Sequence, residues 1–428
     1  MNVSLAYGRG RMSVDVPDHA AVITPSELAG LPDEHAAFTA AVRSPIGSAP
    51  LRELAQAWAT VAIVIADITR PSPSERMVPW IMQELAHVPR ENFVIINGTG
   101  SHRANTREEL ISMLGLEVVE SVRIVNHSAF DDTMLTWVGT TSYGGEIWLN
   151  NDYLNADVRI VTGFIEPHFF AGFSGGPKGI CPGVAGIKTI MHLHNAQMIG
   201  HPLSTWAQLD GNPVQGEIRE AVAMAPPHFL VNVALNTRRE IINVWAGDYL
   251  QAHVEGCQAV QEHAMRAVDE PFDIVVTTNS GYPLDQNLYQ TVKGMSAAAR
   301  IVRPGGAILA VSECSDGLPN HGNFKQLLQM RATPQQLLEM IEQPDFAFFD
   351  QWQVQTQAII QSKADVLLYS SLDPQTVRDA MLTPVEDVGE ALADLLRRYG
   401  PDARVAVLPE GPQTVPFVRG EAVTEGAV

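Results

Sequence analysis

The stretch Val61-Ala-Ile-Val-Ile-Ala66, followed at once by Asp67-Ile-Thr-Arg-Pro71, decides the fold. Six apolar residues, four of them β-branched, are typical of a strand that is buried on both faces. A helical pattern from Ser74 to His87 comes next, and then Phe93-Val-Ile-Ile-Asn97 forms a second such strand before the loop Gly98-Thr-Gly-Ser-His-Arg103. A repeated order of strand, polar loop and helix predicts a parallel sheet with crossover helices.

Neighbouring segments extend this pattern along the chain. A strand-like start at 3–7 and a helical stretch at 48–58 precede it, and the strand Val158-Arg-Ile-Val-Thr162 follows it. Ligands of open parallel sheets bind beyond the carboxyl ends of the strands. One edge of the sheet is therefore predicted to collect three loops, 67–71, 98–103 and 163–195.

A second domain of the same class is predicted to begin near Glu270-Pro271, just before the strand Phe272-Asp-Ile-Val-Val-Thr277. The pattern then continues with a helix at 287–299, a strand at 306–312, helices to about 362, and strands at 366–370 and 403–409. Because 428 residues exceed one ordinary core, we predict an α/β chain of two domains, 1–270 and 271–428. Each domain is expected to hold a mainly parallel sheet with flanking helices, and the active site is expected in the cleft between them.

Charge and composition exclude several classes of protein. The net charge of −20 repels nucleic acid, and the chain has no cluster of Lys and Arg that would override this repulsion. Cys181, Cys257 and Cys314 are far apart, which indicates a reducing compartment and no disulfide framework. The N-terminus has no signal-peptide pattern, and the best apolar run is too short for a bilayer. We expect a soluble, cytoplasmic protein that binds neither nucleic acid nor membranes.

The segment from 166 to 195 is rich in glycine and carries most of the candidate chemistry. Dense glycine is typical of backbone that approaches a ligand, and Ser174, Gly175 and Gly176 suggest an anion-binding nest beside Lys178. The segment is not a Walker A loop, because proline precedes the lysine and glycine follows it where Ser or Thr is needed. A glycine-rich connector with a solvated lysine is an alternative reading.

Histidines are the other candidates, and three of them, His102, His168 and His194, fall on loops of the same sheet edge. If the segment around His192 and His194 is helical, these two side chains lie on opposite faces, so at most one of them faces a site. A purely structural role is the usual one for a single histidine. No His-Glu-x-x-His motif is present, so a metal held here would have an unusual set of ligands.

Two further groups are suited to binding anions. Arg70 can form paired hydrogen bonds with a carboxylate or phosphate and Asp67 can bind a ribose hydroxyl, although the two can equally cap the next helix. In the second domain, Tyr289 and Lys293 are four residues apart on one helical face, with Gln290 beside them. That face either closes over an anion or is an ordinary solvated one.

Together these loops resemble the nickel-pincer-nucleotide-dependent lactate racemase family over most of the chain. The residues that carry the resemblance are Asp67-Ile-Thr-Arg-Pro71, Gly98-Thr-Gly-Ser-His-Arg103, Glu166-Pro-His168, Phe170-Ala-Gly-Phe-Ser-Gly-Gly-Pro-Lys178, Pro182-Gly-Val-Ala-Gly186, Thr189-Ile190 through His194-Asn195, and Tyr282-Pro-Leu-Asp through Lys293. The resemblance implies a pyridinium mononucleotide joined through a thioamide to a lysine, with Ni²⁺ held by a ring carbon, two sulfurs and one histidine. By position, Lys178 is the tether and His194, in preference to His192, is the nickel ligand.

The resemblance also implies that His102 and His168 are the acid/base pair of a 2-hydroxy acid racemase or epimerase. Plain removal of the α-proton is difficult, because the adjacent carboxylate does not stabilise a second charge well. Hydride transfer to the cofactor avoids that dianion and gives a planar 2-keto acid that is reduced on its other face. One histidine serves each enantiomer, so two are required.

Binding residues follow from the resemblance in the same way. The substrate carboxylate is expected to be held by Arg70, Tyr289, Gln290 and Lys293, and the nucleotide by Asp67, Thr69, Arg70, Ser174, Gly175 and Gly176. Residues 1–270 are thus expected to bind the cofactor and carry out catalysis, and 271–428 to complete the substrate site. The expected partners are a small 2-hydroxy acid and the enzymes that make the cofactor.

Two other functions stay open on the residues alone. One is a metal-dependent hydrolase or lyase in which His102, His168 and His194 bind zinc or manganese. The other is a non-catalytic carrier of a nucleotide-like ligand. The identity of the 2-hydroxy acid and the oligomeric state are also open. Phe169, Phe170, Tyr143 and Trp352 either line a pocket for a side chain larger than methyl or, as is more usual for aromatic residues, belong to the core.

Overall fold

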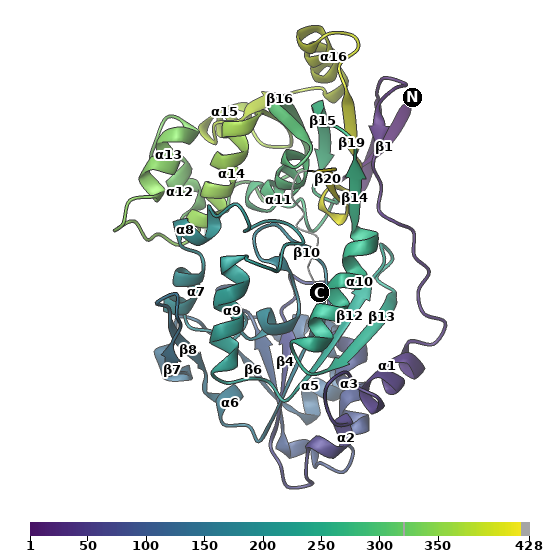
Figure 1. The fold of residues 1–428 in the computed structure, drawn as a ribbon, viewed down its shortest axis with the longest axis vertical. Helices are drawn as coiled ribbons and strands as arrows, with labels where there is room; N and C mark the ends of the chain where they lie inside the picture. Colours follow the sequence, from purple (N-terminus) through teal and green to yellow (C-terminus); the bar gives the residue numbers. More distant parts are fainter. Residues whose placement is uncertain (320–321, 421–428) are drawn as a thin grey trace. The chain divides into compact units, whose positions relative to one another are not determined.

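The computed structural model describes residues 1–319 and 322–420, and they form two compact units (Figure 1). The first unit comprises 27–193 and 205–262, and the second comprises 1–26, 194–204 and 263–428. The structure thus groups the first 26 residues and 194–204 with the C-terminal part of the chain, whereas the predicted boundary at 270 placed both in the N-terminal domain. One physical reason is strand pairing, since Ala21 and Val22 pair with Ala406 and Val407.

The first unit is built on a six-stranded sheet. In spatial order its strands are β13 (Ile241–Gly247), β12 (Phe229–Leu235), β9 (Val158–Phe164), β4 (Val61–Ala66), β5 (Phe93–Gly98) and β6 (Arg123–Asn126). All neighbouring strands are parallel except β12 and β13, which are antiparallel. The predicted parallel sheet with crossover helices is therefore confirmed, and β4 has the predicted bounds.

The core of the first unit lies between this sheet and four helices. The helices are α1 (Glu34–Arg43), α3 (Ser74–Glu84), α4 (Arg107–Leu114) and α5 (Leu116–Ser121), and each supplies buried apolar residues to it. The glycine-rich segment contributes the short 3₁₀ helix η3 (Gly176–Gly179), which packs against β4 and β9. This packing fixes η3 near the strand that precedes it.

Shorter elements and the remaining helices complete the first unit. They are α2 (Leu51–Leu54), α6 (Asn151–Leu154), α7 (Ile187–Leu193), α9 (Pro213–Ala223), α10 (Gln251–Ala264, which runs into the second unit), β7 (Leu135–Thr140), β8 (Glu146–Asn150), β10 (Pro167–His168), β11 (Gly172–Phe173), η1 (Arg90–Asn92) and η2 (Asp132–Met134). The helix predicted over 48–58 is reduced to the four residues of α2. Pro50 precedes its first residue, and proline disfavours a helical conformation of the residue before it, so the helix does not begin earlier.

The second unit holds a second six-stranded sheet, and all its strands are parallel. Their spatial order is β18 (Thr383–Val385), β17 (Asp365–Tyr369), β16 (Val302–Val311), β15 (Phe272–Thr278), β19 (Val405–Leu408) and β3 (Ala21–Val22). One apolar cluster packs the sheet against α11 (Leu288–Ala299), α12 (Phe324–Leu328), α13 (Pro334–Ile341), α14 (Gln351–Lys363) and α15 (Pro374–Asp379). A second cluster packs it against α16 (Val388–Tyr399) and the hairpin of β1 (Asn2–Tyr7) and β2 (Gly10–Asp15).

The other elements of the second unit are α8 (Ala196–Ile199), η4 (Gly411–Gln413) and the parallel pair β14 (Met265–Val268) and β20 (Val415–Val418). Both units are thus α/β, with parallel sheets and flanking helices, as predicted. Within the described ranges, no helix is both long enough and apolar enough to cross a membrane.

Candidate active site

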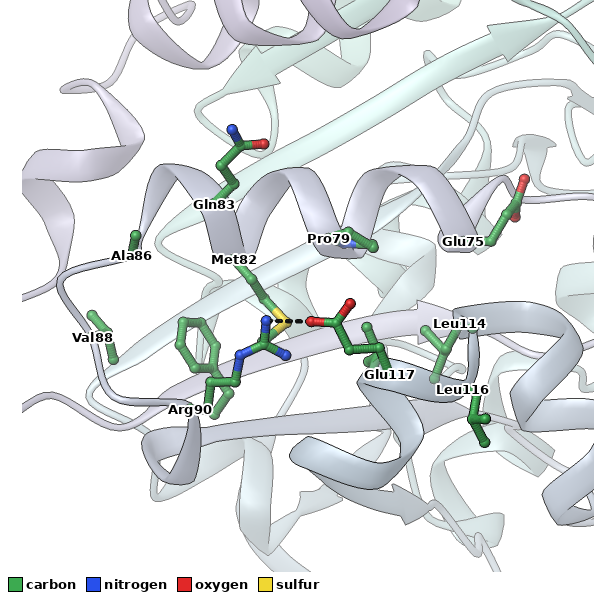
Figure 2. Close-up of a pocket in the computed structure, with 13 residues that line it drawn as sticks. Glu75, Pro79, Met82, Gln83, Ala86, Val88, Arg90, Leu114, Leu116 and Glu117 are labelled. Atoms are coloured by element: carbon green, nitrogen blue, oxygen red, sulfur yellow. Dashed lines mark hydrogen bonds and ion pairs between the residues drawn. The ribbon is translucent and has the colours of Figure 1, made fainter.

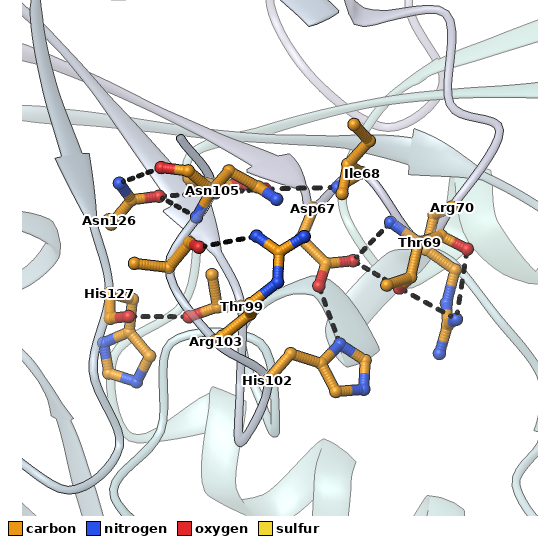
Figure 3. Close-up of polar contacts among 12 residues, drawn as sticks. Asp67, Ile68, Thr69, Arg70, Thr99, His102, Arg103, Asn105, Asn126 and His127 are labelled. Carbon is orange, nitrogen blue, oxygen red and sulfur yellow. Dashed lines mark hydrogen bonds and ion pairs between the residues drawn. The ribbon is translucent and has the colours of Figure 1, made fainter. Parts of the chain in front are cut away.

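Asp67 stands at the centre of the candidate site, directly after β4 and only 3% exposed. One carboxylate oxygen, Oδ1, accepts hydrogen bonds from the Thr69 backbone N–H at 3.2 Å and the Thr69 hydroxyl at 2.6 Å. The other, Oδ2, lies 2.7 Å from Nδ1 of His102, which comes from the loop after β5 (Figure 3). The loops that end these two parallel strands therefore meet, as the topology predicted.

Electrostatics keep Asp67 ionised. Burial alone would raise the pKa of its carboxyl, but the hydrogen bond and charge of His102, the charge of Arg70 and the hydrogen bond of Thr69 together hold the pKa below its ordinary value. A buried carboxylate that contacts an imidazole in this way orients the ring and stabilises its protonated form. The predicted contact of Asp67 with the nucleotide stays a prediction, and the structure gives the residue a different partner.

An asparagine network holds the two loops in place, and sequence reasoning missed it. The Asn97 side-chain amide donates to Oδ1 of both Asn105 and Asn126 at 2.8 Å. Asn105 Oδ1 also accepts from the Ile68 N–H at 3.2 Å (Figure 3). The Thr99 hydroxyl donates to the His127 carbonyl at 2.6 Å. The one signal in the sequence was an asparagine at the end of an otherwise apolar strand.

His168 comes from the two-residue strand β10, where it pairs with Gly172 of β11. Its Nδ1 accepts hydrogen bonds from the backbone N–H groups of Ala171 at 3.3 Å and Phe170 at 3.5 Å. The ring stacks on Phe169 with centroids 4.9 Å apart and meets the edge of Phe170 at 4.5 Å. Both phenylalanines are buried, so they fix the ring of His168 in one place.

Lys178 lies on η3, partly buried, two residues after a pair of glycines with positive φ. Burial lowers the pKa of Lys178 to about 7, and the positive charge of Arg70 acts in the same direction, against Glu166 and Cys181. Near neutral pH a large fraction of Lys178 is therefore the uncharged amine, the nucleophilic form of a lysine.

The backbone before Lys178 is clamped by two buried residues that sequence reasoning missed, Asn232 of β12 and His253 of α10. Asn232 Oδ1 accepts from the Gly176 N–H at 2.7 Å, and His253 Nε2 lies 3.0 Å from the Ser174 carbonyl oxygen. The Ser174 N–H donates to the Glu166 carbonyl at 2.9 Å. Two amides of the predicted anion nest thus have protein partners, and phosphate binding by Ser174, Gly175 and Gly176 stays a prediction.

The remaining predicted residues belong to the second unit. His194 is buried, and its ring centroid lies 4.6 Å from that of Trp352 on α14. The Trp352 indole N–H donates to the Tyr289 hydroxyl at 3.0 Å. Trp352 thus links the predicted nickel ligand to one of the predicted substrate-binding residues of α11.

Tyr289, Gln290 and Lys293 lie in the first turns of α11 and are all partly buried. The helix begins after Asn287, whose side-chain oxygen accepts from the Gln290 N–H at 3.0 Å. This cap fixes the start of the helix and so the direction in which these side chains leave it. Their binding roles stay predictions.

His192, by contrast, lies in α7 and has a carboxylate neighbour, with Nε2 3.6 Å from Oε1 of the buried Glu217. Within the part of the chain that the structure describes, no group of three or more His, Cys, Asp or Glu side chains is placed to hold a metal ion. The alternative of a three-histidine zinc or manganese site therefore has no support in this geometry.

Two family models match this chain. The profile of the lactate racemase N-terminal domain matches residues 7–207, and that of the lactate racemase C-terminal domain matches residues 268–415. The chain belongs to the lactate racemase family. The resemblance predicted from the loop motifs is thus confirmed, and membership of the lactate racemase family makes the chain an isomerase, a racemase.

Two lactate racemases are similar over nearly their whole length. That of Thermoanaerobacterium thermosaccharolyticum is 33% identical over 418 residues, covering 96% of this chain and 98% of the relative. That of Lactiplantibacillus plantarum is 37% identical over 372 residues, covering 86% and 87%. The shared sequence therefore includes both units.

Solved structures agree. The lactate racemase apoprotein from T. thermosaccharolyticum superposes with a TM-score of 0.91 at 32% identity, over 98% of this chain and all of that one. A Thermotoga maritima protein superposes with a TM-score of 0.70 at 18% identity, over 92% of this chain and all of that one, which shows a shared fold only. The α/β architecture is thus that of the lactate racemase family.

A surface hollow of about 520 Å³ lies elsewhere in the first unit, between α3, the α4–α5 segment and the start of β5 (Figure 2). Arg90 and Glu117 form an ion pair across it at 2.7 Å. Phe93, the first residue of β5, lines it, so the hollow is at the amino end of that strand. His102 follows the carboxyl end, and we therefore do not assign the active site of this racemase to the hollow.

The buried His253 gives the clamp a pH dependence. Burial lowers its pKa from 6.5 to about 4, against the hydrogen bond to Ser174. Below pH 6.5 the unfolded chain binds a proton that the folded chain does not, so His253 lowers stability as the pH falls from 6.5 towards 4 and has no such effect above that window. Glutamine keeps an N–H donor at this position. We expect the melting temperature of the His253→Gln chain to fall less between pH 7 and pH 5 than that of the unsubstituted chain. An equal loss in both proteins would contradict this.

Proposed function

We propose that this racemase inverts C2 of a 2-hydroxy acid, using a nickel-pincer nucleotide tethered to Lys178, with His102 and His168 as acid and base. The observation that carries the proposal is the position of Lys178, partly buried on the loop that leaves the same sheet edge as the Asp67–His102 pair. Its pKa of about 7 leaves a substantial share of the amine uncharged near neutral pH. The relatives are lactate racemases, so lactate is the first substrate to test, and larger 2-hydroxy acids are the next.

The residues present fit such a cofactor. Lys178 offers an amine for a thioamide bond, and the neighbouring Arg70 and Thr69 offer a cation and a hydroxyl for the nucleotide phosphate. His194 supplies the imidazole expected of a nickel ligand, and imidazole is a ligand that suits Ni²⁺. When bound, the cofactor would accept the hydride from C2 and return it.

The protein's own groups handle the proton and the carboxylate. Each histidine takes the hydroxyl proton of one enantiomer, which requires an unprotonated ring nitrogen within hydrogen-bond distance of the hydroxyl. We propose that Arg70, Tyr289, Gln290 and Lys293 bind the substrate carboxylate, since paired and charge-assisted hydrogen bonds hold carboxylates best.

A direct test is chiral chromatography of single enantiomers incubated with the chain after co-expression with the cofactor-making enzymes. We expect D- or L-lactate, or a larger 2-hydroxy acid in the same panel, to become racemic at C2. The same chain expressed without those enzymes is the control and is expected to be inactive. A loaded chain that leaves every acid of the panel unchanged would refute the proposed function.

A further inference from the structure

His102 has a defined tautomer. Its Nδ1 lies 2.7 Å from Oδ2 of Asp67, and an ionised carboxylate only accepts hydrogen bonds. Nδ1 therefore carries the hydrogen of the neutral ring, and Nε2 has the lone pair. The His102 side chain is 44% exposed whereas that of Asp67 is 4% exposed, so the proton-accepting end belongs to the accessible member of the pair.

His168 has the other tautomer. Its Nδ1 accepts from the Ala171 N–H at 3.3 Å and the Phe170 N–H at 3.5 Å. Backbone amides only donate, so this nitrogen carries no hydrogen. In the neutral ring the hydrogen is then on Nε2, the nitrogen that has the lone pair in His102.

We propose that the two histidines begin turnover in different roles, with His102, set by Asp67, as the ready base and His168 as a hydrogen-bond donor to the substrate oxygen. This inference rests on the proposed function and deepens it. Asp67 is a positioning residue here, because it acts on the proton transfer through His102. The two histidines of the acid/base pair thus differ in their hydrogen-bond partners, although each takes the hydroxyl proton of one enantiomer.

The proton balance shows what the difference means. When His102 acts, the substrate O–H bond breaks, an N–H bond forms at Nε2, and the imidazolium that results is neutralised by Asp67. The hydride that leaves C2 is the part that the proposed function gives to the cofactor. His168 accepts a proton at Nε2 only after its own hydrogen has moved to Nδ1, and that move displaces the Ala171 amide. Only His168 needs this extra rearrangement.

Steady-state kinetics cannot reveal this difference for a substrate with one stereocentre. The two enantiomers have equal free energy, so kcat/KM must be equal in both directions whatever the histidines do. The tautomers therefore have to be observed directly. Long-range ¹H–¹⁵N spectra of the full chain with ¹⁵N-labelled histidine distinguish a ring nitrogen that carries hydrogen from one that does not.

We expect, at about pH 8, a hydrogen on Nδ1 in His102 and on Nε2 in His168. His102→Gln and His168→Gln assign the two signals. The same tautomer in both rings would overturn the proposal. The measurement uses the chain without cofactor, so it stands apart from the racemisation assay, and correct tautomers in an inactive loaded chain would refute only the proposed function.

Asp67→Asn sharpens the test. Oδ1 already accepts two hydrogen bonds from Thr69, so the amide oxygen of the variant stays on that side and its NH₂ group faces His102. An NH₂ group donates, so Nδ1 of His102 must accept and its hydrogen must move to Nε2. We expect the His102 signal to change tautomer and that of His168 to stay the same.

Asp157→Asn is the matched control, because Asp157 also accepts from a threonine N–H and hydroxyl, those of Thr60, with no histidine hydrogen-bonded to it. It is expected to leave both signals unchanged. A His102 ring that keeps its hydrogen on Nδ1 in Asp67→Asn would overturn the role of Asp67. If that variant does not fold, the spectrum of the unsubstituted chain still decides between the two tautomers.

Discussion

Lys178→Arg is expected to yield a folded chain that carries no covalent nucleotide and has no detectable racemase activity after co-expression with the cofactor-making enzymes. The reason is nucleophilicity. Burial brings the pKa of Lys178 to about 7 and so frees its amine near neutral pH, whereas a guanidinium stays charged and forms no thioamide. Intact-mass analysis and nickel determination on the purified chain measure both consequences.

Lys188→Arg is the matched control. Lys188 follows in the same segment, at an exposed position, where its ammonium group lies 5.4 Å from the centre of the Trp148 ring. Arginine can replace that contact, so the control is expected to keep adduct, nickel and activity. An adduct of unchanged mass on the Lys178→Arg chain would show that the tether lies elsewhere, and full activity without any adduct would refute a tethered cofactor.

His102→Gln is expected to lower kcat for both enantiomers by about 10²–10⁴-fold, the usual contribution of general acid/base catalysis. Glutamine keeps hydrogen-bonding groups near Asp67 but has no group that accepts a proton at neutral pH. Because Lys178 is untouched, the variant is expected to carry the same adduct and the same nickel as the unsubstituted chain. Activity per loaded chain is therefore the quantity to measure.

His87→Gln controls for the loss of a histidine as such. Its Nε2 is hydrogen-bonded to the Ala55 carbonyl at 2.8 Å, in the connection after α3 and away from the carboxyl ends of the strands. Its kcat is expected to stay within twofold. If the His102→Gln chain is as active as this control, His102 is not a member of the acid/base pair.

Much of the fold was readable because local pattern and buried structure agree. The run at 61–66, in which four of six residues are β-branched, favours a buried strand, and β4 is buried with those bounds. The prediction of a helix over 48–58 was wrong because it did not take the effect of Pro50 into account. The assignment of 1–26 to the second unit was beyond local reasoning, since it depends on the pairing of Ala21 and Val22 with residues near the other end of the chain.

The candidate site divides in the same way. The motif residues on loops could be identified because the residue type alone indicates which chemistry a side chain can perform. Their partners were not, because a partner is set by which distant side chain reaches the same place. Asp67 was predicted to bind a ribose hydroxyl, and its contact with His102 was not foreseen. Asn232 and His253 carry no motif, and only the folded chain brings them to the glycine-rich segment.

The clamp on that segment also limits how this protein can change over evolutionary time. A methyl group on Gly176 would come within 2.3 Å of the His253 ring, and Gly176 also has a positive φ that side chains rarely adopt. A mutation of Gly176 is thus penalised both by the His253 ring and by the backbone conformation, so glycine is expected to be retained at this position. Laboratory evolution towards new substrates would do best to leave Gly176 and His253 unchanged.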